Sequence, residues 1–345
     1  MDIVIGLQYG DEGKGKVINY LSESGIYDFC IRYNGGANAG HTIYHQSKKI
    51  VTHQIPSGIV NNIPCLIADN CYVDISKLND EIKYLEKNGI HFTTLFLSKN
   101  AHIIQGAHIN QDYNETKIGT TQSGIGPCSV DKYGRTGVKA GEYAKHNELN
   151  PKIIIADTYE LIHNFYKTHK KHPRILIEGA QGFGLDITHG DYPYVTSSHC
   201  ISTDCFNIGI PFHQLPKKDI TIYGIAKVYE TYVGAKEFQD KNDKTLLDIQ
   251  EKGNEFGATT GRSRQCDYLN LSFLIKSAWI NQIDTLVFNK VDILKAVPDA
   301  FKVYFNNTLH IMDDYEAFKE KIESTVKQDI PWPIRFIWSE SAHQL

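Results

Sequence analysis

The residues best suited to chemistry stand near the start of the chain, where the apolar run Ile3–Leu7 leads into GDEGKGK at Gly10–Lys16. A strand, a glycine-rich turn and a helix in this order bring backbone N–H groups to an anion at the helix N-terminus. The spacing matches the G-x-x-x-x-G-K pattern of a P-loop, but Val17 occupies the position of the usual magnesium-binding hydroxyl. We therefore predict a phosphate site in which the carboxylate of Asp11 can replace that hydroxyl.

A histidine stands in the next glycine-rich segment, YNGGANAGHT at Tyr33–Thr42, which follows a second apolar run. Three glycines and two asparagines permit left-handed turns and a close approach of the backbone to a ligand. His41 carries the side chain that most readily exchanges a proton near neutral pH. Between Gly40 and Thr42 in a loop it would have few packing partners, so we predict a functional rather than a structural histidine.

Two more loops carry groups that suit a nucleotide. The segment IGTTQSGIGP at Ile118–Pro127 contains the paired hydroxyls of Thr120 and Thr121, although glycine- and threonine-rich loops of this kind are common turns. The segment Ile177–Ser198 places Gln181 in a glycine-flanked turn after a predicted strand. Its amide can hydrogen-bond a nucleobase or a transferring group, and a buried amide satisfied by the backbone is an equally good interpretation.

The last two motifs indicate a carboxylate site and a guanine site. Arg262 and Arg264 alternate across the loop NEFGATTGRSR at Asn254–Arg264, and guanidinium groups pair with carboxylates and phosphates through two hydrogen bonds. The sequence FNKVD at Phe288–Asp292 ends a predicted strand. There the carboxylate of Asp292 can accept both N1–H and N2–H of guanine, a pair of donors that adenine does not offer.

Composition argues against several classes of protein. The net charge of −4 provides no basic face for nonspecific binding, so we expect no nucleic-acid partner. No run of about 18 apolar residues is present, and the N-terminus lacks the features of a signal peptide, so we expect no membrane partner. The seven cysteines are scattered without a C-x-x-C pair, which favours reduced thiols in a cytoplasmic protein and argues against a zinc site.

Short apolar runs alternate with segments of helical periodicity along the chain, as in α/β proteins with buried parallel strands. We predict strands at Ile3–Leu7, Phe29–Tyr33, Cys65–Ala68, Thr94–Leu97, Ile175–Glu178, Ile220–Ala226, Thr285–Asn289 and Ile334–Trp338. We predict helices at Lys16–Ser22, Lys77–Asn88, Pro151–His169, Leu269–Asn281 and Asp314–Lys327. The alternation, without a linker or repeat, predicts a single α/β domain over residues 1–345 with a largely parallel central sheet flanked by helices. Ligands of such sheets bind beyond the carboxyl ends of the strands, where most of the glycine-rich motifs lie.

The motifs, taken in order, resemble those of the adenylosuccinate synthetase family. They are GDEGKGK, GGANAGHT, GTT-x-x-GIGP, EGAQG with YPYVTSS, NEFGATTGR and N-K-x-D, and the resemblance runs from Ile3 to about Asp292. Members of this family resemble P-loop NTPases in fold, work as homodimers with Mg²⁺, and couple IMP to L-aspartate with GTP. The resemblance implies that this chain is such a ligase and produces adenylosuccinate, GDP and phosphate.

Carried over by position, the resemblance implies a catalytic set and three binding sites. Asp11 would remove the N1 proton of IMP, and it would ligate Mg²⁺ together with the carbonyl of Gly40. His41 would act as acid or hydrogen-bond donor to the transferring phosphoryl group. Lys14 and Gln181 would complete the catalytic set. GTP would be held by Gly10, Glu12, Gly13, Lys14, Gly15, Lys16, Gly40, His41, Thr42, Lys290, Asp292 and Ser339. IMP would be held by Asp11, Asn38, Ala39, Thr121, Gln181, Thr196, Arg262 and, from the neighbouring subunit, Arg135. L-Aspartate would be held by Thr259, Thr260, Arg262 and Arg264.

This division of roles agrees with the chemistry of the purine ring. The 6-oxygen of IMP is a poor leaving group, and phosphorylation turns it into phosphate, which the amine of aspartate can displace. Removal of the N1 proton makes the 6-oxygen nucleophilic and leads to a 6-phosphoryl-IMP intermediate. Lysine, histidine and Mg²⁺ would spread the negative charge of the phosphoryl group during transfer.

The chain departs from the family pattern at several positions, so two alternatives stay open. Ser123 stands where many members have arginine, ETYVGAKE at Glu230–Glu237 replaces S-T-R-V-G-A-G-P, and the chain end lacks the S-T-G-P of the guanine pocket. One alternative is a 2-aminoadenylosuccinate synthetase acting on dGMP, although Asp11 argues against it because that branch has a smaller residue there. The other is a non-catalytic GTP-binding switch, which would leave His41 and the Thr-Thr-Gly-Arg loop without a role.

Overall fold

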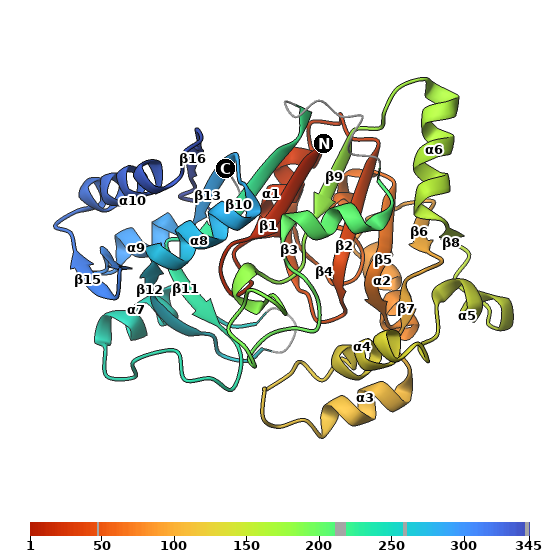
Figure 1. Cartoon of the computed structure of the whole chain (residues 1–345), viewed down its shortest axis with the longest axis horizontal. Coiled ribbons are helices and arrows are strands. Elements are labelled where there is room, and N and C mark those ends of the chain that lie inside the picture. The colour runs from red at the N-terminus through yellow and green to blue at the C-terminus, as the bar shows by residue number, and fades with distance from the viewer. Residues whose placement is uncertain (47, 211–218, 258–260, 342–344) are drawn as a thin grey trace.

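The computed structural model describes residues 1–46, 48–210, 219–257, 261–341 and 345. Its main element is a ten-stranded sheet in the order β16-β13-β10-β1-β9-β2-β5-β6-β8, in which β7 also pairs with β5 (Figure 1). All described strand pairs of this sheet are parallel. The strands are β1 (Asp2–Gly6), β2 (Phe29–Gly36), β5 (Cys65–Val73), β6 (Leu95–Ser98), β7 (His102–Ile103), β8 (Ile153–Ala156), β9 (Ile175–Glu178), β10 (Thr221–Lys227), β13 (Thr285–Asn289) and β16 (Arg335–Trp338).

The central strands are apolar along most of their length because both faces of the sheet are covered. In β1, Ile3 and Ile5 belong to one hydrophobic cluster, while Val4 points to the other face and joins a second cluster with Val17 and Ile18 of helix α1 (Lys14–Ser22). This alternation is the two-residue period of a strand. Burial on both faces therefore explains why the first strand is readable from sequence as an uninterrupted apolar run.

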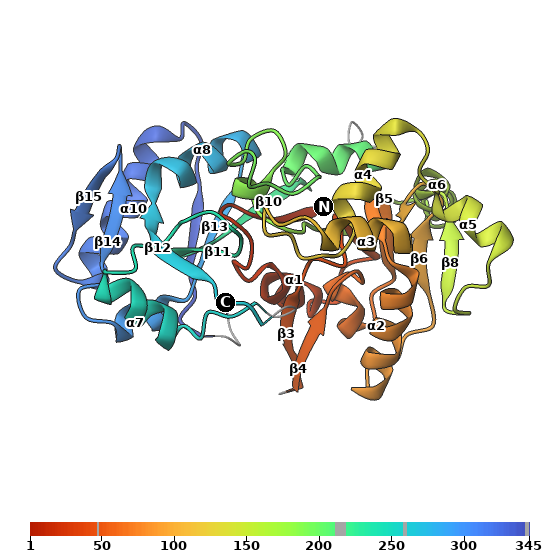
Figure 2. The same ribbon diagram turned by 90° about the horizontal axis from the view of Figure 1, so that it is seen from below.

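Helices cover both faces and the two ends of the sheet (Figures 1 and 2). After α1 they are α2 (Ile75–Lys87), α3 (Gly106–Tyr113), α4 (Ile125–Gly134), α5 (Ala140–His146), α6 (Thr158–His169), α7 (Lys244–Lys252), α8 (Leu271–Asn281), α9 (Val291–Ala296) and α10 (Tyr315–Asp329), with short 3₁₀ helices η1 (Ser57–Asn61), η2 (Phe183–Leu185) and η3 (Ser202–Ile208). Among the helices described here, none combines the length and the apolar character needed to cross a bilayer.

Two smaller sheets flank the phosphate-loop region. A hairpin pairs β3 (His41–His45) with β4 (Lys48–Thr52). A four-stranded mixed sheet has the order β11-β12-β14-β15, formed by β11 (Tyr229–Tyr232), β12 (Gln265–Asn270), β14 (Lys302–Phe305) and β15 (Thr308–Ile311). This mixed sheet lies with α7 and α10 at one end of the molecule, and α3, α4, α5 and α6 lie at the other (Figure 2).

The predicted fold class is confirmed, and all eight predicted strands are found in the large sheet. The predicted helix over Pro151–His169 is wrong at its start, because Ile153–Ala156 forms β8 beside β6. The helix begins only after Asp157, whose carboxylate accepts a hydrogen bond from the N–H of Glu160 at 3.0 Å. Three successive isoleucines favour a strand, and the aspartate cap then starts the helix. The predicted start at Leu269 is also early, since β12 runs to Asn270.

Candidate active site

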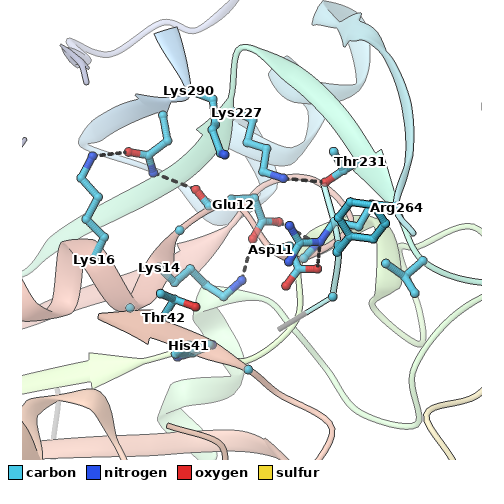
Figure 3. A pocket seen from close by; sticks show the side chains of 18 of the residues that line it. Asp11, Glu12, Lys14, Lys16, His41, Thr42, Lys227, Thr231, Arg264 and Lys290 are labelled. Carbon is cyan, nitrogen blue, oxygen red and sulfur yellow. Dashed lines mark hydrogen bonds and ion pairs between the residues drawn. The ribbon is translucent and has the colours of Figure 1, made fainter. Parts of the chain in front are cut away.

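A cavity of about 550 Å³ opens at the carboxyl ends of the parallel strands, where the loops after β1, β2, β9, β10 and β13 meet (Figure 3). This is the position at which open parallel sheets bind their ligands. Many of the predicted site residues line it, namely Gly10, Asp11, Glu12, Gly13, Lys14, Gly15, Lys16, Asn38, Ala39, Gly40, His41, Thr42, Thr121, Gln181, Arg262, Arg264, Lys290 and Asp292. The cavity also has a cationic lining, which suits substrates that carry phosphates and carboxylates.

The phosphate loop contains an internal ion pair. The buried carboxylate of Glu12 accepts hydrogen bonds from the N–H of Gly10 at 2.9 Å and from Nζ of Lys14 at 2.6 Å. A Cβ at Gly6 would lie 2.5 Å from this carboxylate and one at Gly182 would lie 2.3 Å from it, so both positions require glycine. Glu12, predicted in the GTP site, therefore contacts protein groups and holds Lys14 in place beside the cavity.

Lys16 connects the same loop to the guanine-binding motif. Its Nζ donates to Oδ1 of Asn289 at 3.0 Å, to the backbone oxygen of Ser341 at 2.6 Å, and to Oγ of Ser339. Asn289 in turn donates to the backbone oxygen of Glu12 at 2.7 Å. Burial lowers the pKa of Lys16 to about 8. These contacts fix the distance between the phosphate loop and the loop after β13.

His41 is buried, which corrects the prediction that it lies in a loop with few packing partners. It is the first residue of β3, and its Nδ1 is hydrogen-bonded to Oε1 of the buried Glu178. A Cβ at Gly15 would lie 2.9 Å from the Cβ of His41, so the start of α1 packs closely on this residue. Burial and the charge of Arg32 lower the pKa of His41 to about 4, although Glu178 opposes the shift. The ring is therefore neutral at pH 7 in this arrangement.

The proposed base and one predicted aspartate-binding arginine form an ion pair. Oδ2 of Asp11 accepts from Nε of Arg264 at 2.7 Å, and Nη1 of Arg264 donates to Oε2 of Glu255 at 2.6 Å. Asp11 has a left-handed backbone conformation with φ of 60°, inside the glycine-rich loop. The guanidinium of Arg264 thus links the phosphate loop to the loop that carries the arginines (Figure 3).

Glu255 and Lys227 were not predicted as site residues, yet they form a buried ion pair at the cavity, which Lys227 lines. Both oxygens of the fully buried Glu255 accept from Nζ of Lys227, at 3.0 and 2.9 Å, and Oε1 also accepts from the hydroxyl of Tyr229 at 2.6 Å. Burial would raise the pKa of Glu255, but Lys227, Lys290 and Arg264 lower it to about 2. Lys227 ends β10, so its place at the carboxyl end of a strand is the signal that could have identified it.

The other predicted residues lie in several places. Nη1 of Arg262 donates to the backbone oxygen of Gly119 at 3.1 Å and so joins the two predicted loops. Three predicted residues are not among those that line the cavity. Thr196 donates its N–H to the oxygen of the lining residue Leu185 at 2.8 Å, and Ser339 contacts Lys16. The exposed Arg135 directly follows α4. Thr259 and Thr260 lie outside the described residues.

Fold and cavity together define a class of protein. A lysine- and glycine-rich loop follows the first strand of a parallel sheet, and an N-K-x-D sequence follows β13 at the same edge. This is the architecture of an α/β nucleotide-binding enzyme of the P-loop type.

Comparison with known proteins identifies the family within this class. The model of the family described as adenylosuccinate synthetase matches residues 3–154 and 142–328. The adenylosuccinate synthetases of Borrelia turicatae and Chlorobaculum tepidum are 37% and 36% identical to the chain, each over 92% of this chain and 81% of the relative. The chain belongs to the adenylosuccinate synthetase family and is a ligase of the kind that forms a carbon–nitrogen bond.

Solved structures agree with this assignment. The fully ligated adenylosuccinate synthetase from Plasmodium falciparum matches with a TM-score of 0.78 and 26% identity, over 99% of this chain and 98% of that chain. The succinoaminodeoxyadenylate synthetase of cyanophage S-2L, bound to dGMP and to dATP as an energy donor, matches with a TM-score of 0.71 and 19% identity, over 94% and 99% of the two chains. The second likeness shows a shared fold.

Proposed function

We propose that this chain joins L-aspartate to IMP with GTP as the phosphoryl donor, giving adenylosuccinate, GDP and phosphate. The observation that carries the proposal is that residues from all six motifs line one cavity. The phosphate loop, His41, Gln181, the arginine loop and the loop of Lys290 are far apart in sequence and meet there. A single nucleotide site would not need all of them, whereas a reaction of three substrates does.

Asp11 is the group that takes the N1 proton of IMP in this proposal. Its Oδ2 is bound by Arg264 at 2.7 Å, and its side chain keeps 29% of its surface exposed at the cavity. Once N1 is deprotonated, the 6-oxygen bonds to the γ-phosphorus of GTP while the bond to the bridging oxygen of GDP breaks. The amine of aspartate then forms the bond to C6, loses a proton, and phosphate leaves.

Mg²⁺ is proposed at the phosphate loop, with the Asp11 carboxylate and the Gly40 carbonyl as its protein ligands. Both residues line the cavity and supply the hard oxygen atoms that this ion prefers. The described residues include no group of three or more histidine, cysteine or acidic side chains that could hold a metal ion. Such a sparse protein ligand set fits a Mg²⁺ ion whose other ligands are phosphate oxygens and waters. When bound, the ion would neutralise charge on the transferring phosphoryl group.

A homodimer is proposed as the active form, with Arg135 reaching the IMP phosphate of the neighbouring subunit. Arg135 directly follows α4 and is exposed, and on that helix Val130 and Tyr133 are 69% and 73% exposed. Large apolar side chains with this exposure beside an arginine fit a subunit interface.

Complementation between two inactive variants tests the shared site. The Arg135→Leu variant should bind IMP weakly, and the Asp11→Asn variant should lack the base. Mixed dimers keep one complete site, so an equal mixture should recover about a quarter of wild-type activity, as expected for a symmetric dimer. Absence of any recovery, with dimer exchange verified by a tagged subunit, would contradict the arrangement.

We also propose that residues 1–345 act as one functional domain in the cytoplasm. The cavity is lined from Tyr9 to Ser341, so both ends of the chain contribute to one site. All seven cysteines are free and buried, which suits a reducing compartment.

The first experiment supplies Mg²⁺, GTP and L-aspartate with either IMP or dGMP and follows the ultraviolet change of the succinylated purine. We expect a signal with IMP alone. A signal with dGMP alone would replace the proposal by a 2-aminoadenylosuccinate synthetase. Hydrolysis of GTP that does not depend on any acceptor nucleotide would indicate a GTP-binding switch instead.

A further inference from the structure

We propose that Glu178 is a positioning residue of the active site, which holds the Nδ1–H of His41 and so presents Nε2 of the ring to the transferring phosphoryl group. The inference deepens the proposed function and rests on it for the role of the phosphoryl group. The contact between Glu178 and His41 can be tested without that function. Glu178 begins the EGAQG motif and was not among the predicted site residues.

Glu178 has a full set of hydrogen-bond donors. Its Oε1 accepts from Nδ1 of His41, from Nη2 of Arg32 at 3.1 Å and from Oγ of Ser57 at 2.5 Å. Its Oε2 accepts from the N–H of Ser57 at 2.6 Å. The side chain is completely buried. A carboxylate held by four donors in the interior cannot rotate freely, so its direction toward His41 is fixed.

The partners of Glu178 belong to rigid elements of the main sheet. Glu178 ends β9, and Arg32 of β2 is its direct neighbour in the parallel register. Ser57 begins η1 and binds Glu178 through both its N–H and its hydroxyl. His41 belongs to the separate hairpin of β3 and β4. Glu178 therefore connects the ring to the scaffold that also carries the phosphate loop.

The donor set also decides the tautomer of His41. Arg32 is permanently charged and donates to the same oxygen, so that oxygen acts only as an acceptor. Nη2 of Arg32 also lies 3.1 Å from Nδ1 of His41. Oε1 of Glu178 is closer to Nδ1 than Arg32 is, and a carboxylate has no proton to give, so the proton of the bond between Glu178 and His41 lies on Nδ1. Among the described residues no hydrogen bond to Nε2 is found, and His41 lines the cavity. The atom that remains for a ligand is therefore Nε2.

In the neutral Nδ1–H ring Nε2 carries a lone pair, so the ring donates to a phosphoryl oxygen only after Nε2 has taken a proton from solvent as the anionic substrates bind. A buried carboxylate behind the imidazole holds the ring in one orientation and stabilises the positive charge of that doubly protonated ring. Lys14 lines the cavity nearby and is held by Glu12, so both groups that would contact the phosphates are positioned by buried carboxylates. Glu178 itself touches no substrate in this scheme and acts only through His41.

The first test is spectroscopic and needs no activity. Long-range ¹⁵N–¹H correlation spectra of the ligand-free protein at pH 7 distinguish the two neutral tautomers of each histidine, and His41→Asn assigns the signal. We expect His41 to be the Nδ1–H tautomer in the wild type and to lose this preference in Glu178→Gln. A wild-type ring protonated on Nε2 alone would overturn the proposal, even if Glu178→Gln fails to fold.

The second test is kinetic. Glu178→Gln should lower kcat by about 100-fold, a typical size for one acid–base group, and should change each KM by less than about threefold. The double variant Glu178→Gln/His41→Asn should be no slower than His41→Asn alone, because Glu178 acts through the histidine. Additive losses in the double variant would overturn the proposal.

Glu81→Gln is the matched control. Glu81 is another buried carboxylate, which accepts backbone N–H groups of His53, Gln54 and Ile55 between 2.7 and 3.2 Å. Among the described residues Glu81 makes no hydrogen bond to His41, so its replacement should alter stability without a comparable fall in kcat. If wild-type protein makes no adenylosuccinate, the proposed function fails, and the tautomer experiment still decides the role of Glu178.

Discussion

Two fully buried carboxylates, Glu178 and Glu255, each bind residues that line the cavity, and they differ in what they bind. Glu178 binds one histidine ring, one arginine and one serine. Glu255 binds Lys227 at 2.9 Å and Arg264 at 2.6 Å, and has Lys290 at 3.9 Å. Burial would raise the pKa of each, yet the surrounding cations and donors lower both to about 2.

The difference shows two uses of a buried charge. On the Glu178 side the single charge of Arg32 is matched by the single charge of Glu178. The result is a fixed orientation of the neutral ring of His41. On the Glu255 side three cations share one buried carboxylate, and Arg264 also holds Asp11. The excess positive charge there remains available to anionic substrates. Glu178 therefore positions the ring of His41, whereas the cations around Glu255 attract anionic substrates.

The largest effect is expected from Asp11→Asn, which removes the carboxylate charge that pairs with Arg264 on the Glu255 side. Turnover should fall by about 1000-fold or more, within the range for loss of a general base, while circular dichroism and thermal unfolding stay close to wild type. The measurement is the rate of adenylosuccinate formation at saturating substrates. Substantial residual activity would show that another group takes the N1 proton.

Replacement of the cation-binding carboxylate should destabilise the fold. Glu255→Gln leaves Lys227 without its buried partner, and breaking a buried ion pair costs about 3–5 kcal/mol. The free energy of unfolding in urea measures this loss. The exposed Glu251 on α7 gives the matched control, because Glu251→Gln should change stability by less than about 0.5 kcal/mol. Equal effects of the two variants would mean that Glu255 is not paired as described.

Acid should weaken both regions in the same pH range. The ordinary pKa of 4.5 is lowered to about 2 for Glu178 and Glu255. Each carboxylate therefore contributes stability that is complete above pH 4.5 and is lost as pH falls toward 2, by about 3 kcal/mol per group. Urea unfolding between pH 2 and 7 measures the decline. The decline should be shallower in Glu255→Gln, and curves of equal slope would contradict the assignment.

The smallest effect is expected from Arg264→Lys, which keeps the charge but removes the planar group that contacts both Asp11 and Glu255. Loss of a two-sided guanidinium contact should raise the KM for aspartate by about 10- to 100-fold. The KM for GTP should stay within about threefold. Steady-state kinetics with each substrate varied in turn measures the KM for aspartate and the KM for GTP separately. Arg174→Lys on the surface serves as the control. A larger effect on GTP would assign Arg264 to the phosphate side.

The phosphate loop could be predicted from the sequence, whereas the ion pair of Lys227 and Glu255 could not. GDEGKGK follows an apolar strand directly, so local order alone predicts the loop and the helix after it. Lys227 and Glu255 are 28 positions apart and belong to no short motif that names them as partners. The strands of the mixed sheet, such as YETY in β11, are short and polar, which is why they were not predicted.

For His41, the sequence predicted a functional role, but only the tertiary structure showed its environment. Its residue type and glycine-rich surroundings were enough to mark it as functional, but the expectation of an open loop was wrong because long-range packing buries it against Gly15 and Glu178. The Glu178 contact joins residues 137 positions apart.

By itself, the sequence determined the fold class, the order of the motifs and the family, because strands buried on both faces and glycine-rich turns leave strong local patterns. Only the tertiary structure decided which carboxylate holds which cation, because a buried charge takes its partners from wherever the fold brings them.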